Sequence, residues 1–430
     1  MERKGKTEMK NKWKKIICLV AALIMGMGML TGCGDNAVNA QEFAAYAKSV
    51  NEITVPQEAG IVALGEATHG NKEFQELKLD VFAHLVETTD VRALALEGAF
   101  GGCAVANRYI LYNDGTAEEA VAKLGFQIYR TDQMLELVEW MHDYNMNAEE
   151  GEQVRLYGFD MQRDFESAYL ISDFYSLTDA EKAMEYSAKF DTLFDEANHA
   201  YEPDKITEAE EIFNQIVADL EEKGAEYAGI NEEAYAYALQ GAKCMLQDIE
   251  LQTAGNYSQI RDENMAENVK WIYEREQEVY GAKLMIAGHN GHVAKAVSSA
   301  YTNMGFYLHE ELGEEYFVIG TDFYKTTCNL PTQDGRADYD FCSDDPLAAA
   351  VGGLEGNVYY LDFAEVAAAT ELAGVIEKAI PTGSLGESYS PLMEVMKNTY
   401  QIRIAPGELY DGMILVYEAT PIAVWDYQQQ

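Results

Sequence analysis

The chain lacks the short motifs that identify several common active sites. No Gly-x-Ser-x-Gly is present, since Ser384 follows Thr382-Gly383, so the nucleophile elbow of α/β-hydrolases is missing. Neither a Gly-x4-Gly-Lys-Ser/Thr loop nor a GxGxxG after a strand supports nucleotide binding. Without a CxxC pair, a zinc cluster has no support either. These absences make direct attack by water the expected chemistry, and we expect no cofactor.

Basic side chains are also scarce. The 430 residues include 31 Lys and Arg against 73 Asp and Glu, which gives a formal net charge of -42. Such a surface repels polyanions, so neither nucleic acid nor an anionic lipid headgroup is expected as a ligand. A hydrophobic content of 48% suffices for a large core, arranged as one domain with an insertion or as two domains.

Cysteine is rare, with six in the chain. Two of them, Cys328 and Cys342, are near enough in sequence to pair across a loop outside the cytoplasm, and two free buried thiols fit the sequence equally well. The others are Cys18, Cys33, Cys103 and Cys244.

The N-terminus has the pattern of an export signal. Basic residues up to Lys15 precede the almost entirely apolar stretch Ile16–Leu30, which is too short for a stable membrane-spanning helix. Leu30-Thr31-Gly32-Cys33 resembles a bacterial lipobox, so we expect residues 1–32 to be removed and Cys33 to carry a lipid. An ordinary signal peptide with an incidental cysteine is the alternative. With residues 33–40 as a tether, the mature protein would be a bacterial cell membrane lipoprotein that faces outside the cytoplasm.

Three segments of the mature chain differ in pattern. Residues 41–165 alternate short apolar runs with helical stretches such as Glu73–Glu87, which is typical of a parallel sheet. Residues 166–278 are rich in helix-forming residues, with apolar positions at helical spacing in Glu232–Leu251. Sheet patterns resume over residues 279–430. We therefore predict an α/β fold in which a parallel-sheet core is flanked by helices, with a helical insertion between the third and fourth core strands.

Five strand-like apolar runs end in a polar or ionisable residue. A parallel α/β sheet collects its chemistry at the carboxyl ends of its strands, so these residues should share one rim. The five runs are Ile61–Glu66, followed by Ala67-Thr68-His69, and Arg92–Glu97, Leu156–Asp160, Leu284–His289 and Phe317–Asp322.

Water activation requires a general base held by a second group, and His69 is the best candidate for that base. Either Glu66 or Glu97 is placed to orient its imidazole and stabilise the protonated form. A histidine in a loop after a strand is more often structural, whereas Glu97 at the end of a very apolar strand needs a partner or a shifted pKa. Asp160 and Asp322 are equally well explained as caps of the next helix or loop.

The ordered motifs resemble the erythromycin esterase family. They are Gly65-Glu66-Ala67-Thr68-His69-Gly70, Ala95-Leu96-Glu97-Gly98, Gly158-Phe159-Asp160, Arg261-Asp262-Glu263-Asn264-Met265-Ala266 and His289-Asn290-Gly291-His292-Val293, spread over about Phe43–Thr420. The resemblance implies metal-independent hydrolysis of a small-molecule carboxylic ester or lactone, of which a macrolide is one example.

On the matching positions, His69 would be the base, Glu66 and Glu97 its carboxylate partners, and His289 and His292 the opposite wall of the site. The substrate would be bound by His292, Asp160 and Lys78. Lys78 stands where the family typically carries an arginine, and a lysine supplies a point charge instead of a bidentate clamp.

Two other classes of protein fit the same residues. Glu66, His69, His289 and His292 are possible ligands of a divalent ion in a metal-dependent hydrolase. A non-catalytic lipoprotein that binds haem is the second alternative.

The helical insertion should act as a lid, because it leaves the core after Asp160 and returns before His289. Its tyrosines suit contact with a large, partly apolar ligand, although packing against neighbouring helices explains any single one more simply. They include Tyr201, Tyr227, Tyr235, Tyr237 and Tyr257.

Overall fold

The computed structural model describes residues 38–425, except 150, 163, 196–199 and 334. The predicted signal peptide and Cys33 therefore lie outside the described residues. No helix within the described part of the chain has the length and apolar character needed to cross a membrane.

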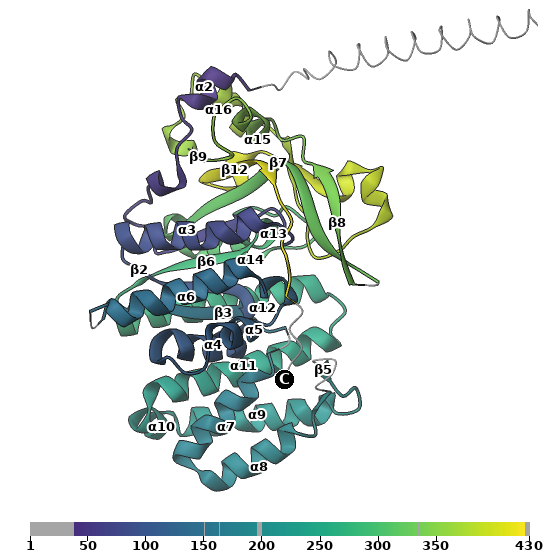
Figure 1. The fold of residues 1–430 in the computed structure, drawn as a ribbon. Coiled ribbons are helices and arrows are strands. Elements are labelled where there is room, and N and C mark those ends of the chain that lie inside the picture. The colour runs from purple at the N-terminus through teal and green to yellow at the C-terminus, as the bar shows by residue number, and fades with distance from the viewer. Residues whose placement is uncertain (1–37, 150, 163, 196–199, 334, 426–430) are drawn as a thin grey trace, which may run out of the picture.

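A central sheet of eight strands organises the fold (Figure 1), in the order β3-β2-β6-β1-β7-β12-β9, with β8 paired to β7 outside this path. The first six are parallel to their neighbours, whereas β9 and β8 are antiparallel to theirs. The strands are β1 Ile61–Glu66, β2 Val91–Ala99, β3 Arg155–Asp160, β6 Lys283–His289, β7 Tyr316–Thr332, β8 Gly335–Cys342, β9 Val358–Asp362 and β12 Gly412–Ala419.

The central strands are buried on both faces, which explains their nearly continuous apolar sequences. In β1, Val62 and Leu64 point into one hydrophobic cluster, and Ile61 and Ala63 point into another. This alternation is the period of two that a strand imposes on its side chains. Helices must therefore cover both faces of the sheet.

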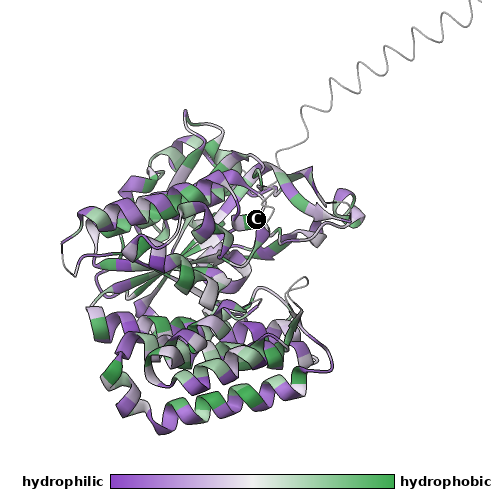
Figure 2. Ribbon diagram, turned by 60° about the horizontal axis from the view of Figure 1, so that its bottom comes forward, coloured by the Kyte–Doolittle hydropathy of each residue, from purple (hydrophilic) through white to green (hydrophobic). Residues whose placement is uncertain are grey.

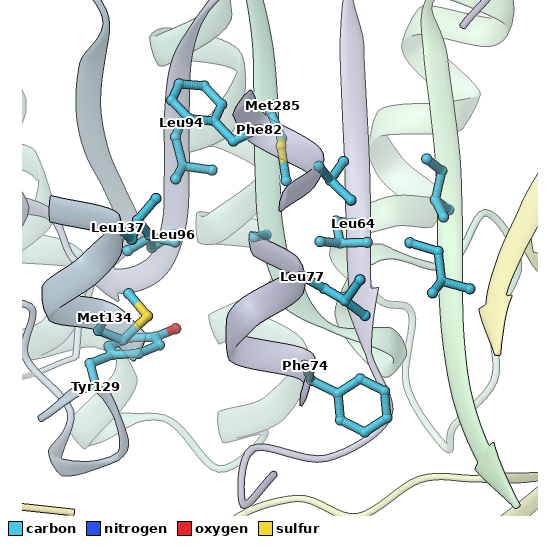
Figure 3. Close-up of a cluster of buried hydrophobic side chains, with 14 of the residues drawn as sticks. Leu64, Phe74, Leu77, Phe82, Leu94, Leu96, Tyr129, Met134, Leu137 and Met285 are labelled. Carbon is cyan, nitrogen blue, oxygen red and sulfur yellow. The ribbon is translucent and has the colours of Figure 1, made fainter. Parts of the chain in front are cut away.

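The first face is covered by α3 Lys72–Thr88 and α6 Asp132–Asn147. Figure 3 shows Phe74, Leu77 and Phe82 of α3 directed at the strands, and Met134 and Leu137 of α6 beside them. Burying a side chain of this size contributes about 1.5–3 kcal/mol. Three further helices complete this part of the chain, namely α4 Phe100–Tyr112, α5 Ala117–Ala122 and η2 Gln127–Tyr129.

The second face is covered mainly by α12 Tyr257–Arg275, whose Met265, Val269 and Ile272 pack with Ile61 and other strand residues. The π-helical turn η3 Glu276–Tyr280 follows α12. The helix α14 Met304–Leu312 packs against α12. The remaining helices are α2 Ala40–Ala44, η1 Val50–Glu52, α13 Asn290–Val293, η4 Gly313–Glu315, α15 Pro346–Val351, η5 Phe363–Glu365, α16 Glu371–Ile376, η6 Pro391–Glu394, η7 Lys397–Thr399 and α17 Pro406–Leu409.

Between β3 and β6 the chain forms a helical layer with a hydrophobic cluster of its own. Figure 2 shows this layer below the sheet, and Figure 1 places it beside the edge strand β3. It contains α7 Glu166–Thr178, α8 Ala180–Phe190, α9 Ile206–Glu222, α10 Gly224–Ile230 and α11 Glu232–Thr253, with the short strands β4 Phe194–Asp195 and β5 Ala200–Tyr201. Two further short strands, β10 Ile380–Gly383 and β11 Gln401–Ile404, pair near the C-terminus.

The predicted fold class is confirmed, and two details differ from those predicted. The strand expected to end at Asp322 continues to Thr332, because β8 folds back on it as a hairpin. The helix α12, placed in the insertion by its composition, packs its apolar face on the sheet. Of the two alternatives for Cys328 and Cys342, the structure has the free thiols, since Cys328 lies opposite Tyr339 and Cys342 opposite Lys325 in that hairpin.

Candidate active site

Four of the expected residues meet where β3, β2, β6 and β1 end side by side. Glu66 and His289 are direct neighbours in the register of β1 and β6, while Glu97 lies in β2 and Asp160 at the end of β3. From β1 the chain goes to β2 and β3 on one side of the sheet, and later to β7 and β12 on the other. Such a switch in strand order opens a crevice beyond the carboxyl ends, where α/β proteins bind ligands.

Glu66 is shared between a histidine and a lysine. The Oε1 atom of Glu66 lies 2.7 Å from Nδ1 of His69, and its Oε2 atom accepts a hydrogen bond from Nζ of Lys78. Glu66 is 3% exposed and Lys78 only 1%. With Nδ1 of His69 donating to the carboxylate, the other ring nitrogen, Nε2, is left to accept a proton.

The charges of this group shift the pKa values of Glu66 and His69 in opposite directions. Burial alone would raise the pKa of Glu66, but the Lys78 ammonium and the contacts with His69 lower it to about 2. Burial alone would lower the pKa of His69, but its hydrogen bond and ion pair with Glu66 outweigh that effect and raise it. The carboxylate therefore stays ionised at neutral pH and favours the protonated form of His69.

The environment of His289 lowers its pKa, whereas that of His69 raises the pKa. Burial and the neighbouring charges of His69 and His292 lower the pKa of His289 to about 3, so its ring is neutral at neutral pH. Its Nδ1 atom accepts a hydrogen bond of 3.1 Å from the backbone N–H of Gly291, which places the ring proton on Nε2. This Nε2 atom is buried and has no hydrogen-bond partner among the described residues. The ring centroids of His69 and His289 are 5.2 Å apart, so His289 offers a free N–H beside the candidate base.

Glu97 is held by donors on both oxygens. Its Oε1 accepts a 2.7 Å hydrogen bond from Nη2 of Arg261, and its Oε2 accepts a 2.8 Å hydrogen bond from the backbone N–H of His289. Burial alone would raise the pKa of Glu97, but the charges of His292 and Arg261 hold it well below its usual range. Glu97 is thus a fixed negative charge behind the two histidines.

Arg261 and Asp262, at the start of α12, complete the group. Arg261 bridges Glu97 and Asp160, and Asp262 accepts a 2.8 Å hydrogen bond from His292. Both residues stand in one of the ordered motifs, but no role was predicted for either. The helical composition of residues 166–278 gave no sign that α12 packs on the sheet, and the adjacent Arg-Asp pair was the available signal.

Comparison with known proteins agrees with this arrangement of strands. A model of the erythromycin esterase family matches residues 86–419, well over half of the chain. The chain belongs to the erythromycin esterase family. The matched segment contains Glu97, Asp160, Arg261 and both histidines of the 289–292 turn, while Glu66 and His69 precede it.

Two relatives share modest sequence identity with this chain. Putative hydrolase YbfO of Bacillus subtilis (strain 168) is 25% identical over 406 residues, which cover 85% of this chain and 84% of the relative. Erythromycin esterase type II of Escherichia coli is 23% identical over 295 residues, which cover 61% and 69% of the two chains. At the level of the family, these names point to a hydrolase.

Solved structures support the same fold. A Bacillus cereus protein aligns with a TM-score of 0.75 and 24% identity, covering 90% of this chain and all of the other. A mutant erythromycin esterase in its open conformation aligns with a TM-score of 0.63 and 15% identity, covering 86% and 93% of the two chains.

The structure brings most of the expected residues together, and the exceptions have physical causes. Lys78 does not face the space beside the histidines, because its ammonium is the buried counter-ion of Glu66. Asp322 lies mid-strand, where its carboxylate accepts the backbone N–H groups of Phe323 and Gly383. Asp160 both accepts from the backbone N–H of Gln162, as a cap does, and pairs with Arg261.

Two of the four side chains considered as metal ligands, Glu66 and His292, have partners on both of their polar side-chain atoms. Nε2 of His289, by contrast, has no hydrogen-bond partner among the described residues. Among the described residues, no group of three or more His, Cys, Asp or Glu side chains has a geometry that would hold a metal ion.

Proposed function

We propose that this protein hydrolyses a carboxylic ester or lactone by attack of a water molecule that His69 deprotonates. The observation that carries the proposal is the 2.7 Å contact of His69 Nδ1 with Glu66 in a site that also holds the unpartnered N–H of His289. Acyl transfer to water requires a general base in a fixed orientation and a free donor for the oxyanion, and this site contains both.

In the proposed reaction, Nε2 of His69 takes a proton from water as the oxygen attacks the carbonyl carbon. The carbonyl oxygen becomes an oxyanion and accepts a hydrogen bond from Nε2–H of His289, whose neutral ring is a donor without a competing partner. When the bond to the alkoxy oxygen breaks, that oxygen receives the proton from His69. The products are a carboxylic acid and an alcohol, and His69 returns to its neutral form.

The proposal requires neutral His69, and the charges around it favour the protonated form. The pKa of His69 is raised because its contacts with Glu66 outweigh burial. The reactive fraction therefore increases with pH, so kcat/KM should rise on an acid limb whose midpoint lies above 6.5.

The test is a hydrolysis screen over simple esters, lactones and macrolides, followed by His69→Ala. Removing a general base typically costs about 10²- to 10⁴-fold in rate. His84→Ala is a matched control, because His84 lies on α3 and contacts the backbone oxygen of Ile53 instead of the site residues. Activity of His69→Ala within threefold of the wild type would refute the assignment of the base.

We also propose that the protein is an exported lipoprotein attached to the cell membrane through Cys33. The support is the Leu30-Thr31-Gly32-Cys33 sequence after an apolar segment. The role of the helical layer as a lid stays a prediction. Tyr201 and Tyr227 are buried in its own core, whereas Tyr257 at the start of α12 is 44% exposed.

A further inference from the structure

Arg261 contacts three of the elements that form the site. Its Nη2 atom donates to Glu97 of β2 at 2.7 Å and to Asp160 of β3 at 2.6 Å, and its Nε atom also approaches Asp160 at 3.2 Å. Its Nη1 atom lies 3.0 Å from Nε2 of His292, in the short helix α13 that follows β6. The side chain is only 13% exposed.

Both ring nitrogens of His292 contact charged side chains. Nε2 lies 3.0 Å from Nη1 of Arg261 and 3.4 Å from Oε1 of Glu97. Nδ1 lies 2.8 Å from Oδ1 of Asp262, which also accepts the backbone N–H of Met304 at 2.8 Å. Both ring nitrogens of His292 are therefore engaged by α12, whereas His289 keeps its free N–H.

We propose that Arg261 is the positioning residue of the proposed ester hydrolase: it holds Glu97 and His292 so that His69 and His289 remain the two side chains that act on the substrate. The inference rests on the proposed function and adds a role that neither the family match nor the neighbouring proteins' names assign. The sequence placed His292 in contact with the substrate, and this geometry assigns it to the framework.

The physical effect of Arg261 has two parts that can be separated. Its charge offsets Glu97 and Asp160, which otherwise form a concentration of negative charge close to His69. Its planar fork fixes the positions of three partners at once, which a lysine ammonium cannot do. Loss of the charge should raise the pKa of His69 further, and loss of the fork should displace Glu97, whose Oε2 holds the backbone N–H of His289.

Several titratable or charged groups face this part of the site from the surrounding elements. They are Glu66, His69, Lys78, Glu97, Asp160, Tyr257, Asp262, His289, His292, Tyr301 and Glu387.

The experiment compares Arg261→Met, which removes both charge and fork, with Arg261→Lys, which keeps the charge. The control is Arg275→Met, because Arg275 lies on the same helix and pairs with Glu232 away from the histidines. Two quantities are measured for each folded variant: the pH profile of kcat/KM on the ester found in the screen, and the titration of His69 by imidazole NMR.

For Arg261→Met we expect kcat/KM to fall about tenfold or more and the His69 midpoint to rise by about 0.5 pH unit or more. For Arg261→Lys we expect the midpoint to return to that of the wild type while kcat stays low. Arg275→Met should change neither quantity by more than about the experimental error.

Two results would overturn the inference. One is an unchanged His69 midpoint in folded Arg261→Met, and the other is full recovery of kcat in Arg261→Lys. If Arg261→Met does not fold, the inference is tested by the kcat of Arg261→Lys alone: a low kcat supports it and a wild-type kcat overturns it. If the wild-type protein cleaves no ester, the proposed function fails, and the NMR titration still tests the role of Arg261.

Discussion

Replacing Lys78 with methionine should destabilise the protein more than any single surface change on α3. The side chain of Lys78 is almost completely buried, and its ammonium is the counter-ion of Glu66, which is buried as well. Methionine has a similar length and no charge, so it would leave Glu66 as a buried carboxylate with only His69 beside it. Removing one member of a buried ion pair typically costs about 3–5 kcal/mol.

The lowered pKa of Glu66 gives a second route to the magnitude. A fall from 4.5 to about 2 in the folded state corresponds to about 3 kcal/mol of stability above pH 4.5. Because the folded pKa is depressed, this stability is present above pH 4.5 and is lost as the pH falls toward 2. In Lys78→Met the pKa of Glu66 should rise, so the deficit relative to the wild type should be largest at pH 7 and shrink below pH 4.

The assay is urea unfolding at pH 7, 5, 4 and 3, with the free energy of unfolding extrapolated to water. Lys72→Met is a matched control on the same helix, because Lys72 pairs with Glu76 at the surface and should change stability by less than about 1 kcal/mol. The double variant Glu66→Gln/Lys78→Met should recover part of the loss. A deficit below about 1 kcal/mol at pH 7, or one that does not depend on pH, would refute the reasoning.

Three further predictions concern other residues. His289→Ala should lower kcat by about 10²-fold with little change in KM, because it removes the free N–H expected to meet the oxyanion; steady-state kinetics check this, and an unchanged kcat counts against it. Asp345→Asn should raise stability at pH 7 by about 1 kcal/mol or more. Burial raises the pKa of Asp345 to about 6 and also raises the pKa of its buried neighbour Asp322, so the wild type loses stability as the pH rises through 6, and the variant should show a smaller pH dependence in unfolding experiments. Cys33→Ser should leave the protein unprocessed and free of tight membrane association, and fractionation with normal cleavage and attachment would contradict the lipoprotein proposal.

The positions of the site residues in the chain could be predicted because the ends of buried strands can be recognised from the sequence. An apolar run that stops at a carboxylate or histidine marks both the strand and its edge, which located Glu66, Glu97 and His289. The same rule failed for Asp322, because nothing in an apolar run shows that a partner strand will extend it. Pairing between β7 and β8 is a contact between two segments, and a local pattern does not contain it.

The roles of the charged residues were harder to predict than their positions. Lys78 is separated from Glu66 by part of a helix, and only the packing of α3 on the sheet decides that its ammonium points inward. Arg261 lies in a helix-rich segment, where no local pattern shows whether a charged side chain is solvated or directed at the sheet. In both cases the three-dimensional path of the helix, and not the residue type, decides between substrate contact and support.

The order of the strands also bears on how the protein acquires its activity. β6 lies between β1 and β2, two strands that follow one another in the chain, and the hydrogen bond from His289 to Glu97 joins residues 192 positions apart. Until residues 283–289 are made, β1 and β2 each lack a native neighbour, and exposed edges of this kind favour wrong pairing or aggregation. Contacts of such long range also slow folding. The base, the donor and their carboxylates therefore come together only when β6 pairs with both β1 and β2.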